Sequence, residues 1–295
     1  MSARRGRIAI VGAGPVGQGL ALLARGRGYE VSCVVSRRRS SARALARLTR
    51  TSLYSDSPSE IPEHTDIILV AVPDSELRAV SKSLSKSFRR ARKKRWVIHT
   101  SGVTPADVLA PLRRLNIGIA SIHPIRSFPP GPPPAWKELE GTWFGVETSA
   151  RERAWALRFV RCLGGRSLIV PKSKKTLYHI ACTFASNYAL TLLQAVSIIA
   201  RRAGMKKDLR PFEKLLITSI GRGFRVGPTA ALTGPVVRGD RSVLKQHREE
   251  LRRALPKLLP LFDELVLLTA REAVSGRRLT AKQRRAIRTL FASPS

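Results

Sequence analysis

Residues 7–17 read RIAIVGAGPVG, and this stretch decides the fold class. A short β-branched run ends in a GxGxxG motif, and a helical pattern over 16–25 follows it. A strand, a glycine-rich turn and a helix in this order are the context in which the motif predicts a dinucleotide site, because the free N–H groups at the helix start face the phosphates. The alternative is a glycine-rich turn without a ligand. The predicted cofactor-binding residues of this turn are Gly12, Gly14, Pro15, Val16 and Gly17.

The end of the second expected strand, over 30–35, indicates which dinucleotide binds. When the cofactor is NAD, an acidic residue at this point bonds a ribose hydroxyl. Here the strand is followed by Ser36, Arg37 and Arg38, with no carboxylate. A hydroxyl and a guanidinium fork suit a 2′-phosphate, so the sequence favours NADP(H) over NAD. The alternative is that these arginines only begin a solvated helix.

The first 170 residues continue to alternate between strand and helix patterns. Further strands are expected over 66–72, 96–100, 117–122, 143–147 and 167–170, and helices over 37–50, 75–92 and 151–163. This alternation predicts an α/β Rossmann domain over 1–170, with a doubly wound, mostly parallel sheet.

The rest of the chain, 171–295, is expected to form an all-α domain. Helices are expected over 174–203, 209–225, 241–255, 256–274 and 281–290. Residues 180–200 carry no charge and are numerous enough to cross a bilayer, but Thr183, Asn187 and Gln194 are costly in hydrocarbon. The pattern therefore favours a buried helix of a soluble protein, with no membrane association.

Open α/β sheets bind ligands at the carboxyl ends of their strands. Val72 and Pro73 end one expected strand, Ser101 follows the next, and His123 ends a third. We expect Val72, Pro73 and Ser101 to contact the cofactor and His123 to contact the substrate. The alternative for Ser101 and His123 is a capping or packing role.

The expected helix over 174–203 carries a polar row. Lys175, His179, Thr183 and Asn187 recur every four residues, and Ser186 lies beside them. A lysine on such a row can act as general acid toward a carbonyl or imine, since desolvation lowers its pKa. We predict Lys175, His179 and Asn187 as catalytic and Ser186 as substrate-binding. The alternative is a solvated lysine with a satisfied core histidine and asparagine.

The segment 231–240, ALTGPVVRGD, supplies two more candidates. Arg238 can pair with an anionic substrate group or with Asp240, which is a suitable N-cap for the helix over 241–255. Thr233 and Arg238 are predicted to bind substrate.

The formal net charge is +34, from 54 Lys+Arg and 20 Asp+Glu. A hydrophobic content of 43% excludes a wholly disordered polycation. The charge is +17 before residue 171 and +17 after it, so it marks no separate basic arm. A nucleic-acid-associated protein is an alternative, but of the aromatic residues only Phe88 and Trp96 interleave with the basic run 86–95. We expect no specific nucleic-acid partner.

The three cysteines, Cys33, Cys162 and Cys182, are widely spaced and form no CxxC motif. This usage favours a reducing, cytoplasmic location and predicts no metal site.

Several stretches together resemble one known family. They are the GxGxxG turn, 72–74 (VPD), 99–102 (HTSG), 121–128 (SIHPIRSF), 175–179 (KTLYH), 185–188 (ASNY) and 231–240. Over nearly the whole chain they are similar to Rossmann-like proteins whose C-terminal half is domain of unknown function 2520. More distantly, the chain resembles ketopantoate reductases, pyrroline-5-carboxylate reductases and the 6-phosphogluconate dehydrogenase superfamily.

This resemblance implies NADP binding in the first domain and a homodimer formed through the helical domain. Relatives in the superfamily use a lysine and, four residues on, an asparagine; here the lysine falls on Lys175 and the asparagine position holds His179, so Asn187 is the substitute. The expected function is an NADP-dependent oxidoreductase acting on the carbonyl or imine of a small, carboxylate-bearing metabolite. The alternative is a non-catalytic NADP-binding sensor on the same fold.

Overall fold

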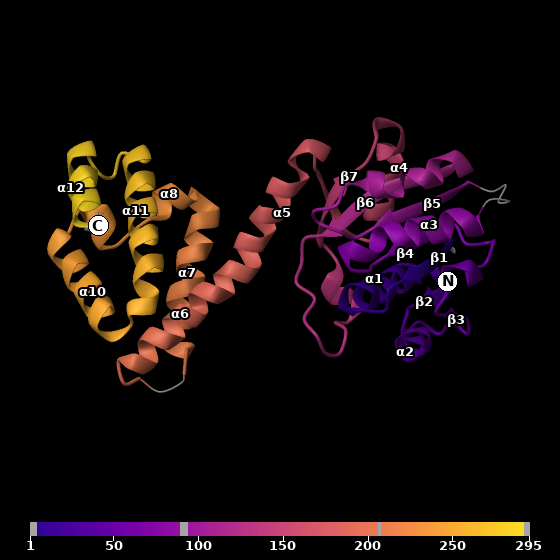
Figure 1. Cartoon of the computed structure of the whole chain (residues 1–295), viewed down its shortest axis with the longest axis horizontal. Coiled ribbons are helices and arrows are strands. Elements are labelled where there is room, and N and C mark those ends of the chain that lie inside the picture. Colours follow the sequence, from indigo (N-terminus) through magenta and orange to yellow (C-terminus); the bar gives the residue numbers. More distant parts are fainter. Residues whose placement is uncertain (1–4, 89–93, 206–207, 292–295) are drawn as a thin grey trace. The chain divides into compact units, whose positions relative to one another are not determined.

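The computed structural model describes residues 5–88, 94–205 and 208–291, and the chain divides into two compact units, Met1–Ser186 and Asn187–Ser295. The first unit holds an eight-stranded sheet in the order β3-β2-β1-β4-β5-β6-β7-β8 (Figure 1). Its strands are β1 (Arg7–Val11), β2 (Glu30–Val35), β3 (Tyr54–Ser55), β4 (Ile67–Val70), β5 (Arg95–His99), β6 (Ile117–Pro124), β7 (Trp143–Glu147) and β8 (Arg166–Ile169). Only β6 and β7 pair antiparallel, so the predicted doubly wound, mostly parallel sheet is confirmed.

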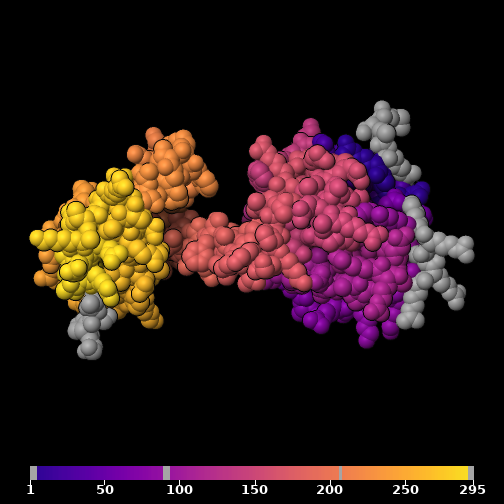
Figure 2. All heavy atoms as spheres, turned by 90° about the horizontal axis from the view of Figure 1, so that it is seen from above, coloured from indigo at the N-terminus to yellow at the C-terminus, as the bar shows by residue number. Residues whose placement is uncertain are grey.

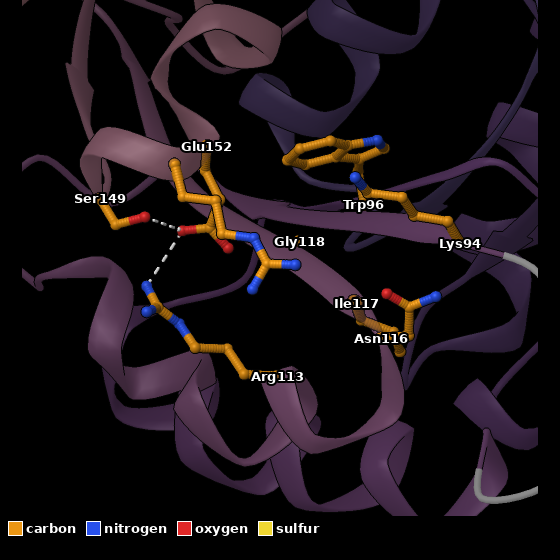
Figure 3. Close-up of a pocket in the computed structure, with 9 residues that line it drawn as sticks. Lys94, Trp96, Arg113, Asn116, Ile117, Gly118, Ser149 and Glu152 are labelled. Atoms are coloured by element: carbon orange, nitrogen blue, oxygen red, sulfur yellow. Dashed lines mark hydrogen bonds and ion pairs between the residues drawn. The ribbon is translucent and has the colours of Figure 1, made fainter.

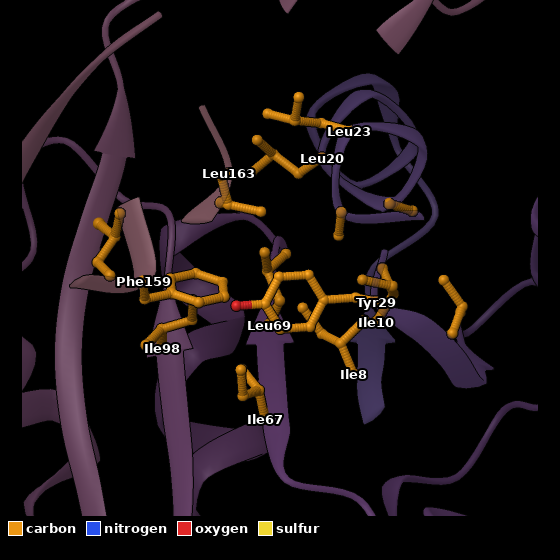
Figure 4. Packing of buried hydrophobic residues seen from close by; sticks show 14 of the residues in the cluster. Ile8, Ile10, Leu20, Leu23, Tyr29, Ile67, Leu69, Ile98, Phe159 and Leu163 are labelled. Carbon is orange, nitrogen blue, oxygen red and sulfur yellow. The ribbon is translucent and has the colours of Figure 1, made fainter. Parts of the chain in front are cut away.

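Both faces of the sheet are buried, because successive residues of each strand point to opposite sides. Ile8 and Ile10 of β1 pack in one core with helices α1 (Pro15–Gly26), α2 (Arg39–Thr49) and α4 (Ala150–Cys162). Figure 4 shows this core around Tyr29 and Phe159. Ala9 and Val11 face the other core, beneath α3 (Leu77–Ser87) and the 3₁₀ segment η3 (Ala106–Leu115). Each fully buried leucine or isoleucine contributes about 1.5–3 kcal/mol.

Three short elements of the first unit differ from the sequence expectations. β3 has only two residues, too few for a periodic pattern, and it was not predicted. η3 contains Pro111, which removes a backbone donor and hides the helical pattern. The helix expected over 75–92 begins with the 3₁₀ turn η2 (Asp74–Glu76) and continues as α3 to Ser87, while 89–93 of the basic run lie outside the described residues.

The second unit is helical, as predicted. Its helices are α6 (Ala189–Arg202), α7 (Arg210–Val226), α8 (Pro228–Ala231), α9 (Pro235–Arg238), α10 (Arg241–Ala254), α11 (Leu259–Ser275) and α12 (Ala281–Phe291). A core that includes Val237, Leu244 and Ile287 joins α9, α10, α11 and α12. Asp240 accepts a hydrogen bond from the Val243 N–H at 3.2 Å, which confirms it as the N-cap of α10.

The expected helix over 174–203 is interrupted. α5 (Lys175–Thr183) is followed by a π-helical turn, Phe184–Tyr188, and then by α6. Within the described residues, Lys172–Arg202 is the one helical stretch long and apolar enough to cross a membrane, and none of its most apolar window is buried. The expectation of a buried helix was therefore wrong for the single chain, in which Leu190 is 66% exposed.

Candidate active site

The glycine-rich turn packs against the protein at Gly12 and Gly17 and has free space beside Gly14. Gly12 has φ of 105°, a conformation that favours glycine, and its N–H donates to the Val35 carbonyl at 2.8 Å. Gly17 lies against the Gly12 carbonyl, so a Cβ at Gly17 would overlap that oxygen. By contrast, a Cβ at Gly14 would have no atom within 4 Å. The turn therefore leaves room for a ligand at Gly14, beside the start of α1 at Pro15.

A cavity of about 650 Å³ opens in front of this turn. Its size is within the usual range for small-molecule and cofactor sites. Sequence-predicted residues that line it are Gly12, Gly14, Ser36, Arg37, Arg38, Val72 and Pro73. The structure thus brings together the glycine turn, the end of β2 and the loop after β4, as a dinucleotide requires.

Two carboxylates in this cavity were missed by the sequence analysis. Arg37 Nη1 lies 2.9 Å from Glu76 Oε1, and both residues line the cavity. Asp56 also lines it, because β3 pairs with β2 and brings Ser55 opposite Val35. Because β3 has only two residues and shows no periodic pattern, no local signal in the sequence marks the acid that follows it.

A second cavity, of about 240 Å³, lies at the ends of β5 and β6. It is lined by the predicted residues Val16, Val72, Ser101, His123 and His179, and also by Asp74, Gly102 and Arg126. Val72 lines both cavities, so the two adjoin at the loop after β4. Arg126 was missed as a site residue, although it follows His123 by three positions at the same strand end.

Ser101 lines the second cavity and also caps the loop behind it. Its Oγ accepts the Val103 and Thr104 N–H groups at 3.2 and 2.8 Å, and its own N–H donates to His99 Nδ1 at 3.2 Å. Burial, followed by the charge of Lys175, lowers the pKa of His99 to about 3. A neutral His99 therefore holds the Ser101 backbone in place.

Two imidazoles meet at Gly102. A Cβ at Gly102 would overlap the His179 ring and lie 3.0 Å from His123 Nε2. Burial is the main cause that lowers the pKa of His123 to about 4, and the charges of His179 and Lys175 act in the same direction. His123 is therefore neutral near pH 7, and it can donate or accept a hydrogen bond at the cavity.

Lys175 lies behind the second cavity and does not line it. It is 1% exposed, and its Nζ donates to Ser121 Oγ at 2.5 Å. Ser121 Oγ in turn donates to the Ser101 carbonyl at 3.1 Å. Burial lowers the pKa of Lys175 to about 8. Lys175 therefore contacts the Ser101 loop through Ser121, and its role as general acid stays a prediction.

The other predicted site residues lie in α5, in the π-helical turn that follows it, and in the second unit. Lys175 and His179 share one side of α5, but the π-helical turn shifts the residues after it off the row that an unbroken α-helix would make. Ser186 is half-buried in that turn, and Asn187 is exposed and begins the second unit. Thr233 and Arg238 are exposed residues of the second unit. Their roles at the site stay predictions.

A further pocket, of about 90 Å³, lies where β5 and β6 begin (Figure 3). Glu152 fills its floor, accepting from Ser149 Oγ at 2.8 Å and from Arg113 Nη2 at 3.0 Å. Ligands of such sheets bind at the opposite strand ends, so this pocket is a structural ion-pair cluster. No group of three His, Cys, Asp or Glu side chains among the described residues could hold a metal ion.

A mostly parallel sheet covered on both faces, with a glycine-rich turn after β1 and a helix after that turn, defines a Rossmann-type protein; here a helical C-terminal part follows it. Family models agree with this class: a Rossmann-like domain matches residues 1–124, and the domain of unknown function DUF2520 matches residues 142–269. The chain therefore carries a Rossmann-like domain followed by DUF2520, which confirms the resemblance. A search of curated proteins found no match.

Several solved structures share this fold at low sequence identity. Protein TM1727 from Thermotoga maritima is 24% identical, with a TM-score of 0.70 over 92% of this chain and 99% of its own. The candidate NADP oxidoreductase BF3122 from Bacteroides fragilis is 20% identical, with a TM-score of 0.71 over 90% and 98%. An imine reductase from Myxococcus stipitatus in complex with NADP⁺ is 16% identical, with a TM-score of 0.62 over 92% and 94%.

Proposed function

We propose that this protein is an NADP(H)-dependent oxidoreductase that acts on the carbonyl or imine of a small, anionic metabolite. The observation that carries the proposal is the meeting of two cavities at Val72, one at the glycine turn and one lined by His123 and His179. The names of the structural neighbours, which include NADP⁺-bound imine reductase, support it. NADPH, when bound, would supply the hydride, and the chain would supply positioning and hydrogen bonds.

The second cavity offers the groups that such a reaction needs. His123 would donate a hydrogen bond to the oxygen or nitrogen on which negative charge develops, the kind of contact that stabilises a transition state. Arg126 would hold an anionic substrate group: its Nη1 donates to the Glu138 carbonyl at 2.7 Å, and the guanidinium carries further N–H donors that suit an anion. His179 and Asn187 remain proposed catalytic residues, and Ser186, Thr233 and Arg238 remain proposed substrate-binding residues.

The direct test is NADPH titration followed by a panel of 2-keto acids and cyclic imines. Oxidation of NADPH by one class of substrate supports the proposal. Tight NADPH binding with no oxidation across the panel would instead identify a sensor, and absence of NADPH binding would contradict both.

Cofactor preference is expected to depend on Arg37. Arg37→Ala should weaken NADPH binding about tenfold and leave NADH binding nearly unchanged, because only NADPH carries the 2′-phosphate that the guanidinium would contact. Glu76→Gln should strengthen NADPH binding for two reasons. It frees Arg37 from its 2.9 Å ion pair, and it removes a negative charge that would repel the 2′-phosphate. Fluorescence titration with both cofactors measures this. Equal losses for NADPH and NADH in Arg37→Ala would refute the assignment.

Lys175 is expected to affect turnover more than cofactor binding. Lys175→Ala removes the ammonium that holds Ser121, and through it the Ser101 carbonyl, while the glycine turn is untouched. We expect kcat to fall at least tenfold, with NADPH affinity within twofold of the wild type. Lys175→Met, which fills most of the volume, separates loss of charge from loss of packing. Parallel loss of turnover and NADPH affinity would be evidence against this role.

We also propose a cytoplasmic homodimer formed through α6 and α7. Leu190 of α6 and Phe224 of α7 are 66% and 89% exposed, and other large apolar side chains of the two helices are exposed too, as is usual at an interface. In Figure 2 the orange segment with α7 and α8 stands out from the yellow helices of its unit. The polar Asn187 and Gln194 favour a second copy over a bilayer.

Light scattering on the wild type and on Leu190→Glu tests the dimer. We expect the wild type to be a dimer and Leu190→Glu to be a monomer. The control is Thr191→Glu, at the neighbouring exposed residue, and it should stay dimeric. A monomeric wild type, or a chain recovered with membranes, would rule the proposal out.

A further inference from the structure

Tyr178 of α5 makes a direct contact with His123 in the second cavity. Its hydroxyl lies 2.7 Å from His123 Nδ1, and the two rings meet edge to face at 87°, with centroids 5.7 Å apart. Tyr178 is not among the residues that the sequence predicts at the site. Because Nδ1 is engaged with Tyr178, Nε2 is the ring nitrogen next to Gly102 at the cavity.

Strand β7 provides the space for this contact. Gly145 is the register partner of His123 across the antiparallel β6–β7 pair. A Cβ at Gly145 would overlap the Tyr178 hydroxyl and lie 2.5 Å from its Cζ. A side chain on β7 at this position would therefore displace the phenol from His123.

Both groups are neutral near pH 7, so the direction of their hydrogen bond depends on which is the stronger donor and which the stronger acceptor. Burial is the main cause that raises the pKa of Tyr178, so the phenol keeps its proton, while the lowered pKa of His123 leaves the imidazole neutral. The other groups near this pair are Lys175 and His179 of α5, Cys182 beside Tyr178, and Asp74 and Arg126 at the cavity. A phenol O–H is a stronger donor than a neutral imidazole N–H, and an unprotonated imidazole nitrogen is a stronger acceptor than a phenol oxygen or a thiol. This comparison favours donation from the phenol to Nδ1, with the histidine proton on Nε2.

We propose that Tyr178 is a positioning residue that holds His123 in the Nε2–H tautomer, so that the ring presents a donor to the second cavity. The expected effect on kcat rests on the proposed function. The tautomer itself is a property of the chain without cofactor or substrate.

The test combines nitrogen NMR of the histidine rings with kinetics on the full-length protein. The chain has five histidines, and His123→Ala assigns the signal of interest. We expect the wild type to show His123 protonated on Nε2, and Tyr178→Phe to show mixed tautomers. We also expect Tyr178→Phe to lower kcat at least tenfold, with an unchanged KM for NADPH.

Two further variants sharpen the test. Gly145→Ala should reproduce the loss of the single tautomer by displacing the phenol, whereas Tyr54→Phe, which removes a hydroxyl far along the sheet, should change neither readout. A proton on Nδ1 in the wild type, or an unchanged tautomer in Tyr178→Phe, overturns the inference. If the tautomer shifts as expected but no carbonyl or imine is ever reduced, the inference stands and the proposed reductase function fails.

Discussion

His123→Ala is expected to lower kcat by roughly two to three orders of magnitude, the usual cost of removing one preorganised donor from a developing negative charge. The structure supports this size of effect, because His123 faces a cavity at two strand ends and its second nitrogen is held by Tyr178 at 2.7 Å. The affinity for NADPH should change little, since the glycine turn lies in the other cavity. Steady-state kinetics and an NADPH titration on the same preparation measure both quantities.

His64→Ala is the matched control for this variant. His64 is exposed in the loop before β4, and it lines neither cavity. The His64→Ala variant should keep the wild-type kcat. If His123→Ala retains more than about a third of wild-type kcat, which means that the activation free energy rises by less than about 0.7 kcal/mol, His123 is not the donor we propose.

Gly17→Ala is expected to destabilise the first unit by about 3 kcal/mol, the upper end of the usual cost of overpacking. The added methyl group would overlap the Gly12 carbonyl, which is backbone and cannot move without breaking the turn that joins β1 to α1. Thermal or denaturant unfolding measures the loss. Gly14→Ala, at a residue with nothing within 4 Å and an ordinary φ of −75°, should unfold like the wild type. Similar stability of Gly17→Ala and Gly14→Ala would contradict this account of the turn.

The sheet could be predicted well because its signals are local. The alternation of apolar runs with helices, and the GxGxxG motif after β1, depend only on neighbours in the chain. The same rule of strand ends predicted Ser101 and His123, which the second cavity brings together. The mostly parallel order followed from the βαβ pattern.

The parts that could not be predicted depend on contacts between distant segments. Asp56 lines the cavity at the glycine turn because a two-residue strand, β3, pairs with β2. Asn187 would lie on the same side as Lys175 and His179 if the helix were a regular α-helix throughout. The π-helical turn that contains Asn187 breaks this regular spacing. Lys175 was expected at a cleft, and its burial against Ser121 follows from packing that no spacing rule contains.

The structure explains the positions of a few of the basic residues behind the net charge of +34. Arg37 and Arg126 now have proposed ligands, and Arg95 is buried at the start of β5, where it donates to the Thr65 carbonyl at 3.1 Å. We find no structural reason for most of the other basic residues.

The central claim is that the open side of the glycine turn holds NADP(H), and calorimetric titration of NADPH into the wild type and Gly14→Ala tests it most directly. Gly223→Ala, on α7 of the second unit, is the matched glycine control. We predict that the wild type and Gly223→Ala bind NADPH alike, while Gly14→Ala stays folded and loses at least tenfold in affinity because its methyl group occupies ligand space. Equal NADPH affinity in all three proteins, or no binding to the wild type, would contradict the account.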